Sequence, residues 1–173
     1  MCVCKEECDE RCWNRSAMVE CDPTSCPVSL RKGGLCDNQR LLREANRFVV
    51  VRETKNKGRG LFADENIKKN EFVIEYTGIT TRHKSVSKVC TYMMKLDKDR
   101  VIDAIHDDNP ARYANHSCEP NAYTQVWTVE GKSHVGIFAL RNIKKGEEIT
   151  FNYGRTNGNT KCSCEKKKCR GVF

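Results

Sequence analysis

A polar segment in the middle of the chain, Arg112-Tyr113-Ala114-Asn115-His116-Ser117-Cys118-Glu119-Pro120-Asn121, is the most informative part of the sequence. It begins inside a predicted short helix, because Asn109 can cap that helix and Pro110 stands at its first position. A second segment, Glu148-Ile149-Thr150-Phe151-Asn152-Tyr153, follows a turn at 144–146 and predicts the last strand.

Short β-favouring runs around these two segments predict a mainly β body. The runs lie at 48–51, 72–76, 92–96, 101–104, 123–129 and 134–140. The last two are joined by Glu130-Gly131-Lys132-Ser133, a typical hairpin signal. A helix is expected over 37–44, and 155–160 has the composition of a polar linker.

Composition excludes several classes of protein. The chain has 173 residues, 38% of them hydrophobic, so it can bury a core without relying on disulfides. Its longest apolar runs are only a few residues, whereas a membrane span needs roughly 20. The N-terminus carries no secretory signal, which favours a reducing compartment and no membrane association. A net charge of +8 is weak evidence for an anionic partner.

The twelve cysteines divide the chain into a head (1–46), a body (47–154) and a tail (155–173). Seven lie in the head, at Cys2, Cys4, Cys8, Cys12, Cys21, Cys26 and Cys36. Their close spacing suits tetrahedral thiolate coordination of zinc, and seven ligands fill two four-coordinate sites if one sulfur is shared. The alternative is a disulfide framework with one unpaired thiol, which the missing secretory signal disfavours.

The tail offers three further ligands, Cys162, Cys164 and Cys169. A fourth must come from elsewhere, and Cys118 is the first candidate, with His116 or Cys90 as alternatives. If Cys118 is the ligand, the metal fastens the tail onto the body beside Asn115-His116-Ser117.

Gly58-Arg59-Gly60-Leu61-Phe62-Ala63 matches a dinucleotide-binding fingerprint, but the context argues against that function. The next strand is expected to start by Phe72, which leaves no room for a crossover helix, and 79–84 holds no acidic residue for a ribose. We expect a glycine turn here, with a different nucleotide-like ligand still possible.

The glycine loop, the Asn-His-Ser-Cys-x-Pro-Asn segment and the Glu-x-x-Phe-x-Tyr segment together resemble the SET-domain lysine methyltransferases, in the same order. The tail is similar to their post-SET zinc motif. The head is similar to the AWS module, which precedes the SET domain in nuclear enzymes that act on histone H3, above all at lysine 36. The resemblance implies small curled β-sheets with a knot-like core, S-adenosylmethionine as cofactor, and a monomeric catalytic unit acting on the H3 tail and the nucleosome in chromatin.

Site residues follow from the same resemblance. It implies Tyr153 as the catalytic residue and Phe151 and Tyr76 as walls of the substrate channel. The implied cofactor-binding residues are Lys57, Gly58, Arg59, Gly60, Tyr92, Arg112, Asn115, His116, Tyr153, Thr160 and Ser163. About three zinc ions are implied, held by Cys118 and the ten head and tail cysteines. From pattern alone, Arg112 could instead be a surface charge, His116 a core histidine, and Phe151 and Tyr153 core residues.

The expected reaction is an in-line transfer of a methyl group, in which the enzyme contributes mainly by positioning. The target amine must be neutral although free lysine has a pKa of about 10.4, so an apolar channel and a nearby sulfonium must lower that pKa. The resemblance implies that Phe151 occupies the position at which phenylalanine leaves room for more than one methyl group, so we expect at least dimethylation and a capacity for trimethylation.

The sequence departs from the family pattern in three places. The insert at 79–91 is short, Ile79 replaces a common acid, and Glu165 replaces the usual glycine after the second tail cysteine. We expect lysine 36 of histone H3 as the target, with lysine 4 of that histone or a non-histone lysine as the alternative and a non-catalytic chromatin-binding module as a further one. Lysine pairs and triplets at 68–69, 144–145 and 166–168 are either solvated turns or contacts to nucleosomal DNA. Cys90 is expected to be a small buried hydrophobe.

Overall fold

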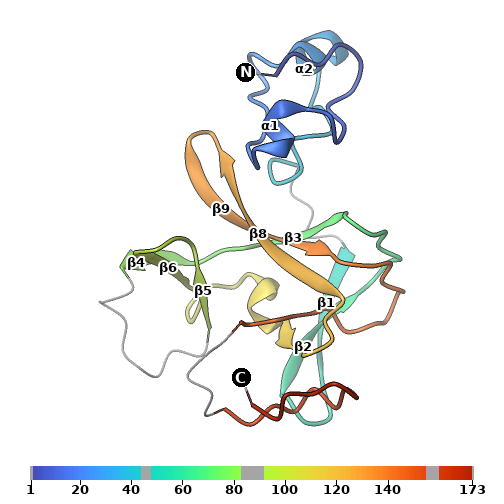
Figure 1. Cartoon of the computed structure of the whole chain (residues 1–173), viewed down its shortest axis with the longest axis vertical. Coiled ribbons are helices and arrows are strands. Elements are labelled where there is room, and N and C mark those ends of the chain that lie inside the picture. Colours follow the sequence, from blue (N-terminus) through green and yellow to red (C-terminus); the bar gives the residue numbers. More distant parts are fainter. Residues whose placement is uncertain (1, 44–47, 83–91, 155–159, 173) are drawn as a thin grey trace.

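The computed structural model describes residues 2–43, 48–82, 92–154 and 160–172 (Figure 1). Within these ranges the strands form separate small sheets. One pairs β1 (Val49–Glu53) with β2 (Arg59–Ala63), and a second orders β3 (Phe72–Tyr76), β9 (Lys132–Ala139) and β8 (Ala122–Val129). A third orders β4 (Ile79–Arg82), β6 (Arg100–Asp103) and β5 (Met93–Lys95), and the last pairs β7 (Asn115–His116) with β10 (Thr150–Phe151).

This architecture confirms the expectation of a mainly β protein with small sheets. All neighbouring strands are antiparallel except β7 and β10, which are parallel, with Thr150 opposite Asn115 and Phe151 opposite His116. This pair joins the two segments that carried most of the sequence information. The knot-like threading itself stays an inference from the resemblance.

The helices are short. They are α1 (Trp13–Ser16), α2 (Pro27–Lys32) and the 3₁₀ helix η3 (Pro110–Tyr113). The helix η3 is the predicted one, with Asn109 Oδ1 accepting the backbone N–H of Ala111 at 2.8 Å. The sequence analysis missed α1 and α2, although Pro27 at the first turn of α2 is a usual start signal. In the parts of the chain that are described, no helix is long and apolar enough to cross a membrane.

Several strand boundaries differ from those expected. Strands β2, β4 and β7 were not predicted, and the last strand is shorter than 148–153. The β8–β9 turn is tighter than expected, because Val129 pairs with Lys132 and only Glu130 and Gly131 form the turn. Their φ angles of 49° and 76° fit the twist of a two-residue hairpin.

The helix predicted over 37–44 is wrong, since residues 37–43 form turns and residue 44 lies outside the described ranges. The cause is a buried carboxylate on the preceding segment. Glu20 accepts the backbone N–H of Leu41 at 2.6 Å and that of Leu42 at 3.3 Å. The side chain of Gln39 is buried and donates to the carbonyl of Cys21 at 2.7 Å. Tertiary partners thus take the donors that a helix would have used itself.

The head is attached along one edge of β8 (Figure 1). The backbone N–H of Thr128 donates to the carbonyl of Met18 at 2.8 Å, and the backbone N–H of Glu20 donates to the carbonyl of Thr128 at 2.9 Å. Arg40 places its guanidinium 4.7 Å from the ring centroids of both Trp127 and Phe138. Burial lowers the pKa of Arg40 to about 10, which still leaves it charged at neutral pH, and the ring faces favour that charge.

Two apolar clusters hold the body together. The larger one gathers side chains from most strands and includes Leu61, Ile74, Ile137 and Ile149. The smaller one lies under the head and contains Leu41, Phe72, Trp127, Val129 and Phe138. Because Leu41 belongs to the head, the smaller cluster links the head to the β3–β9–β8 sheet by apolar burial as well as by hydrogen bonds.

Replacing Glu20 with alanine should destabilise the junction between head and body. It leaves the buried N–H groups of Leu41 and Leu42 without their acceptor, at a cost of about 2 kcal/mol in the free energy of unfolding. Urea denaturation measures the effect as a lower midpoint with an unchanged slope. Glu10→Ala is the control, because Glu10 is an exposed carboxylate on the same head. An equal loss in both variants would contradict the role given to Glu20.

Candidate functional site

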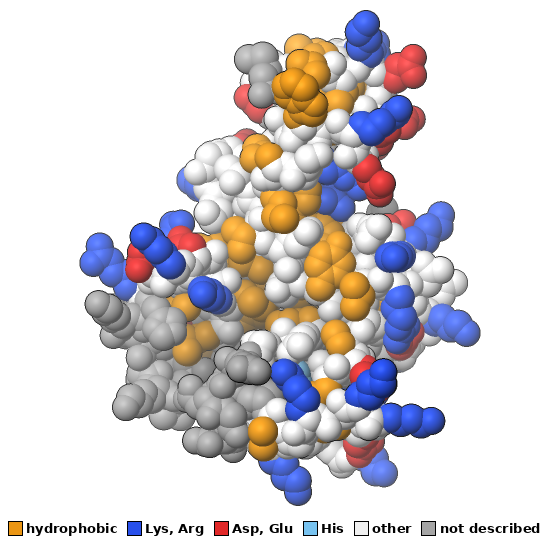
Figure 2. All heavy atoms as spheres, viewed as in Figure 1, with side chains coloured by type: hydrophobic (Ala, Val, Ile, Leu, Met, Phe, Trp, Pro, Cys, Tyr) orange, Lys and Arg blue, Asp and Glu red, His pale blue; other side chains and the backbone are white. Residues whose placement is uncertain are grey.

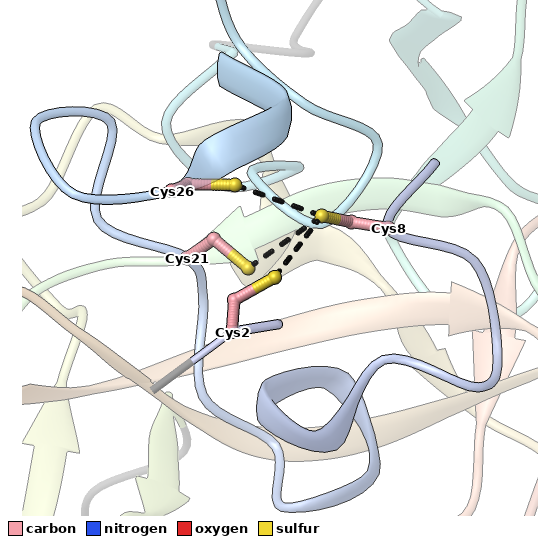
Figure 3. A group of neighbouring side chains, drawn as sticks. All are labelled: Cys2, Cys8, Cys21 and Cys26. Atoms are coloured by element: carbon pink, nitrogen blue, oxygen red, sulfur yellow. Dashed lines mark hydrogen bonds between the residues drawn. The ribbon is translucent and has the colours of Figure 1, made fainter. Parts of the chain in front are cut away.

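The sulfur atoms of the head converge as the cysteine spacing predicts. Cys2, Cys8, Cys21 and Cys26 form a buried group whose sulfurs all lie within 4.8 Å of one another. The sulfur of Cys8 faces the other three sulfurs, 3.5 Å from Cys2, 3.6 Å from Cys26 and 4.0 Å from Cys21 (Figure 3). Sulfurs bound at about 2.3 Å to a tetrahedral zinc ion lie about 3.8 Å apart, so this spacing suits zinc.

A second group overlaps the first. It contains Cys2, Cys4, Cys8 and Cys12 and therefore shares Cys2 and Cys8 with the first group. Cys36 adjoins Cys8 and Cys26, which brings all seven head sulfurs into one cluster. All described cysteines are free thiols, and the 3.5 Å closest approach exceeds the length of about 2.05 Å of a disulfide. The head therefore has the geometry of a metal cluster and not of a disulfide framework.

The tail forms a third group. Cys118, Cys162, Cys164 and Cys169 bring their sulfurs within 4.8 Å, with Cys118 and Cys162 3.8 Å apart. Cys118 is thus placed as the fourth member, as the first of the sequence alternatives predicted. His116 lies behind it, with Nε2 3.4 Å from the Cys118 sulfur. Cys90, the other alternative, lies outside the described residues.

Local backbone geometry prepares some of these thiols for ionisation. Burial opposes the charged form of Cys26, but the backbone and side chain of Ser29 at the start of α2 lower its pKa to about 7. Burial likewise opposes the charge on Cys164, and backbone hydrogen bonds from Cys118 and Lys166 lower its pKa to about 6. Zinc binds the thiolate form, so both environments favour metal binding.

The glycine loop closes the β1–β2 hairpin. Thr54 fixes it by donating its backbone N–H and its hydroxyl to the carbonyl of Gly58, both at 2.7 Å. Gly58 has a φ of +66° with open space where a side chain would stand. At Gly60 a Cβ atom would lie 2.6 Å from Thr54 Cγ2 and 2.9 Å from Glu148 Oε1, so only glycine fits. The expected glycine turn is present, and residues 59–63 continue as strand β2.

Glu148 joins the three motifs, although the sequence analysis did not include it among the site residues. Its carboxylate accepts hydrogen bonds from the Lys57 ammonium, at 2.6 and 2.8 Å, and from the side-chain amide of Asn115, at 2.9 Å. The same amide also donates to the carbonyl of Arg59 at 3.1 Å. The signal was available, because Glu148 is the first residue of the quoted Glu-x-x-Phe-x-Tyr segment.

Tyr153 lies against the Asn-His strand. Its hydroxyl donates to the carbonyl of Ala114 at 2.9 Å, and its backbone N–H donates to His116 Nδ1 at 3.1 Å. His116 Nδ1 therefore acts as an acceptor, which places the ring proton on Nε2 toward the Cys118 sulfur. Burial, with Arg170 and Lys57 nearby, lowers the pKa of His116 and keeps it neutral at pH 7. The tail sulfur group and the backbone of Tyr153 are thus linked through one imidazole.

Aromatic rings lie beside the Tyr153 ring, although Tyr153 itself is 36% exposed. The Phe151 ring centroid is 4.8 Å away and Phe151 is buried. Burial raises the pKa of Tyr153, and the neighbouring Tyr92 and Glu148 raise it further. Burial also raises the pKa of Tyr76 at the end of β3, with Tyr153 as the next contribution. Both phenols stay protonated at neutral pH.

Arg112 makes contacts within the body. Its Nη1 donates to the carbonyls of residues 104, 105 and 107 at 2.7 to 3.0 Å. Its Nη2 donates to the Tyr113 hydroxyl at 2.9 Å, and its guanidinium carbon lies 5.1 Å from the Tyr92 ring centroid. These contacts hold η3 against the end of β6. The cofactor contact assigned to Arg112 stays a prediction, as does that of Tyr92.

The tail residues of the predicted site are less tightly packed. A cleft of about 530 Å³ between the β1–β2 loop and the tail is lined by Ser163 and Lys57, among other residues. Thr160, shortly before Ser163 in the sequence, is exposed. Among the described lining residues of this cleft, neither Asn115 nor Tyr153 occurs. The structure therefore brings together the glycine loop with Lys57, Asn115, His116 and Tyr153, and Lys57 also lines the cleft that contains Ser163.

The body is thus a β domain of small separate sheets that has cysteine clusters on both sides and brings together a glycine loop, an Asn-His strand and Tyr153. The sequence model of the SET domain matches residues 58–154, and that of the AWS domain matches residues 4–44. The chain belongs to the SET-domain family and carries an AWS domain ahead of the SET domain. This confirms the resemblance inferred from the motifs.

Relatives agree with this assignment. The chain is 42% identical over 95% of its length to the human protein named histone-lysine N-methyltransferase, H3 lysine-36 specific. It is 38% identical over 96% of its length to human histone-lysine N-methyltransferase SETD2, and 39% identical over 96% to the H3 lysine-36 specific enzyme of Debaryomyces hansenii. It spans only 6%, 7% and 24% of the length of these three proteins.

Cys118→Ser should release metal from the tail. It should also weaken the contact through His116 that positions the backbone of Tyr153. We expect about one zinc equivalent fewer by atomic emission, because one of four thiolate ligands is lost. The loss should also raise hydrogen exchange in 161–172. Cys90→Ser is the matched control, since Cys90 is the one cysteine outside the predicted ligand sets. Unchanged zinc content in Cys118→Ser would contradict the tail assignment.

Proposed function

We propose that this chain is a protein-lysine N-methyltransferase unit that uses S-adenosylmethionine to methylate histone H3 at lysine 36. The observation that carries the proposal is the meeting of 57–60, 114–116 and 148–153 around Glu148 and Tyr153. The names of the relatives, two of which specify H3 lysine 36, support the substrate.

The residues present fit the proposed cofactor. Gly58 leaves open space above the loop, Gly60 allows a close backbone approach, and Asn115 is held by two acceptors beside them. We assign the binding of S-adenosylmethionine to 57–60, Asn115, His116 and Tyr153, with Tyr92, Arg112, Thr160 and Ser163 around them. When bound, this cofactor supplies a methyl group carried on a positively charged sulfur.

Tyr153 positions the lysine amine in this proposal. Its hydroxyl donates to the carbonyl of Ala114, and a phenol oxygen that donates one hydrogen bond can also accept one from an amine. The raised pKa of Tyr153 means that it acts as a neutral hydrogen-bond partner and not as a base at neutral pH. The buried rings of Tyr76 and Phe151 provide an apolar environment beside it, which lowers the pKa of the amine and favours its neutral form.

Zinc has a structural function here. We assign two zinc ions to the seven head thiolates and one to the tail group, with no open coordination position for chemistry. The tail ion holds residues 161–172 beside the site, and the link from Cys118 through His116 to Tyr153 ties it to the catalytic strand.

The unit is proposed to act as a monomer on the H3 tail within nucleosomes in the nucleus. Lys68, Lys69, Lys144, Lys145 and Lys166–Lys168 are all exposed. Figure 2 shows Lys and Arg side chains projecting around the edge of one face, while hydrophobic side chains gather across its middle. Exposed lysines of this kind can neutralise DNA phosphates, in which case binding weakens steeply with salt.

The direct test is transfer of labelled methyl groups to nucleosomes and to free histones, with mapping of the modified residue. We expect labelling at H3 lysine 36 and a loss of about a hundredfold or more in kcat for Tyr153→Phe, since it removes a hydroxyl from the reacting site. Tyr123→Phe is the matched control, because its ring stacks on Phe138 away from the site.

Three outcomes would contradict the proposal in different ways. Equal activity of Tyr153→Phe would exclude the catalytic assignment. Labelling only at lysine 4 or on a non-histone protein would replace the substrate. Absence of S-adenosylmethionine binding by calorimetry would favour a non-catalytic chromatin module.

The number of methyl groups transferred should depend on Phe151. Its ring is buried against Tyr153, and a tyrosine hydroxyl added there would occupy space and bind the amine. We expect the native chain to form at least dimethyl-lysine and Phe151→Tyr to stop mainly at monomethyl-lysine, measured by mass spectrometry of an H3 peptide. The same product distribution for both proteins would remove this role from Phe151.

A further inference from the structure

The tail contains one residue in a backbone conformation that its side chain disfavours. Glu165 follows Cys164 and has a φ of +52°, in the left-handed region that glycine adopts most easily. This backbone conformation therefore lowers the stability of the fold relative to a glycine at the same position. A contact made by the Glu165 side chain can offset that loss.

That contact crosses from the tail to the β1–β2 loop. The side-chain amide of Asn56 donates to Glu165 Oε1 at 2.6 Å, between residues 109 positions apart. A carboxylate acceptor makes such a bond stronger than one between neutral groups. In the described ranges, no other hydrogen bond or ion pair joins 53–58 to 160–172.

The β1–β2 loop, which supplies Asn56, is held in place by its own hydrogen bonds. Thr54 closes it onto Gly58, and the backbone N–H of Lys57 donates to Thr54 Oγ1 at 2.9 Å. Lys57, next to Asn56, is paired with Glu148. Glu165 therefore fastens the tail to a segment that is itself fixed to the site.

The bond spans the cleft of about 530 Å³ between loop and tail, and Asn56, Glu165, Lys57 and Ser163 all line it. Both bonded side chains are exposed, so water can compete for them and the bond can open. We propose that Asn56 and Glu165 form a latch that holds the tail against the glycine loop and retains bound S-adenosylmethionine. This rests on the proposed function and assigns a positioning role to both residues.

The test compares Asn56→Ala, Glu165→Gly and the double variant with the native chain. Glu165→Gly removes the acceptor and relieves the backbone, so it should fold at least as well as the native chain. We expect each single variant to raise the KM for S-adenosylmethionine about three- to tenfold, the effect of one hydrogen bond. The kcat at saturating cofactor and the KM for the H3 peptide should stay within about twofold of the native values.

Two further variants separate the latch from general effects. Glu165→Gln keeps an acceptor oxygen and should restore most of the affinity for the cofactor. Glu119→Gln removes a charge from the same cleft, where the Glu119 side chain makes no contact across it among the described residues, and should change nothing. The double variant should be no worse than either single variant, because both remove the same bond.

Hydrogen exchange of 161–172 without cofactor gives an independent readout. Faster exchange in Asn56→Ala and Glu165→Gly, and not in Glu165→Gln, is expected. If the native chain fails to bind S-adenosylmethionine, the proposed function fails while this exchange pattern still tests the latch. Native exchange rates in both variants, or additive losses in the double variant, would overturn the latch.

Discussion

The carboxylate of Glu148 is the contact on which the site depends. It accepts hydrogen bonds from Lys57 in the glycine loop and from Asn115 in the Asn-His strand. The segment that carries Glu148 continues to Phe151 and Tyr153. Its oxygen lies so close to Gly60 that a side chain there is excluded. A charged acceptor shared by two donors is stronger than separate neutral bonds, and here it joins three segments that are distant in sequence.

The sulfur clusters extend this arrangement to both ends of the chain. The tail group takes Cys118 from the segment that also supplies His116, so metal binding and the placement of Tyr153 share one short stretch of backbone. The head group is more distant and acts through β8, where Glu20 and Arg40 attach it to the sheet. The head therefore packs against the β3–β9–β8 sheet, whereas the tail lies beside Cys118 and the Asn-His strand.

Sequence patterns were most reliable where a residue type has one main use. Cysteines at close spacing predicted all three sulfur groups, and the choice of Cys118 over His116 was made in the structure by the sulfur positions. The helix over 37–44 failed because Glu20, seventeen or more residues earlier, takes its N–H donors. Glu148 heads the Glu-x-x-Phe-x-Tyr segment, but its role depends on its donors Lys57 and Asn115, which come from elsewhere in the chain and meet it only in the folded structure.

The sequence by itself indicated the family and the mainly β class, and it predicted the clustered cysteines and the segments that meet at the proposed site, because each depends on residue types at short spacing. Tertiary structure alone decided which of those residues meet. In the folded chain Arg112 donates hydrogen bonds to three backbone carbonyls. Lys57 pairs with Glu148, and Asn56 donates a hydrogen bond to Glu165. Such contacts depend on how strands far apart in sequence pack together, and local patterns carry no information about that packing.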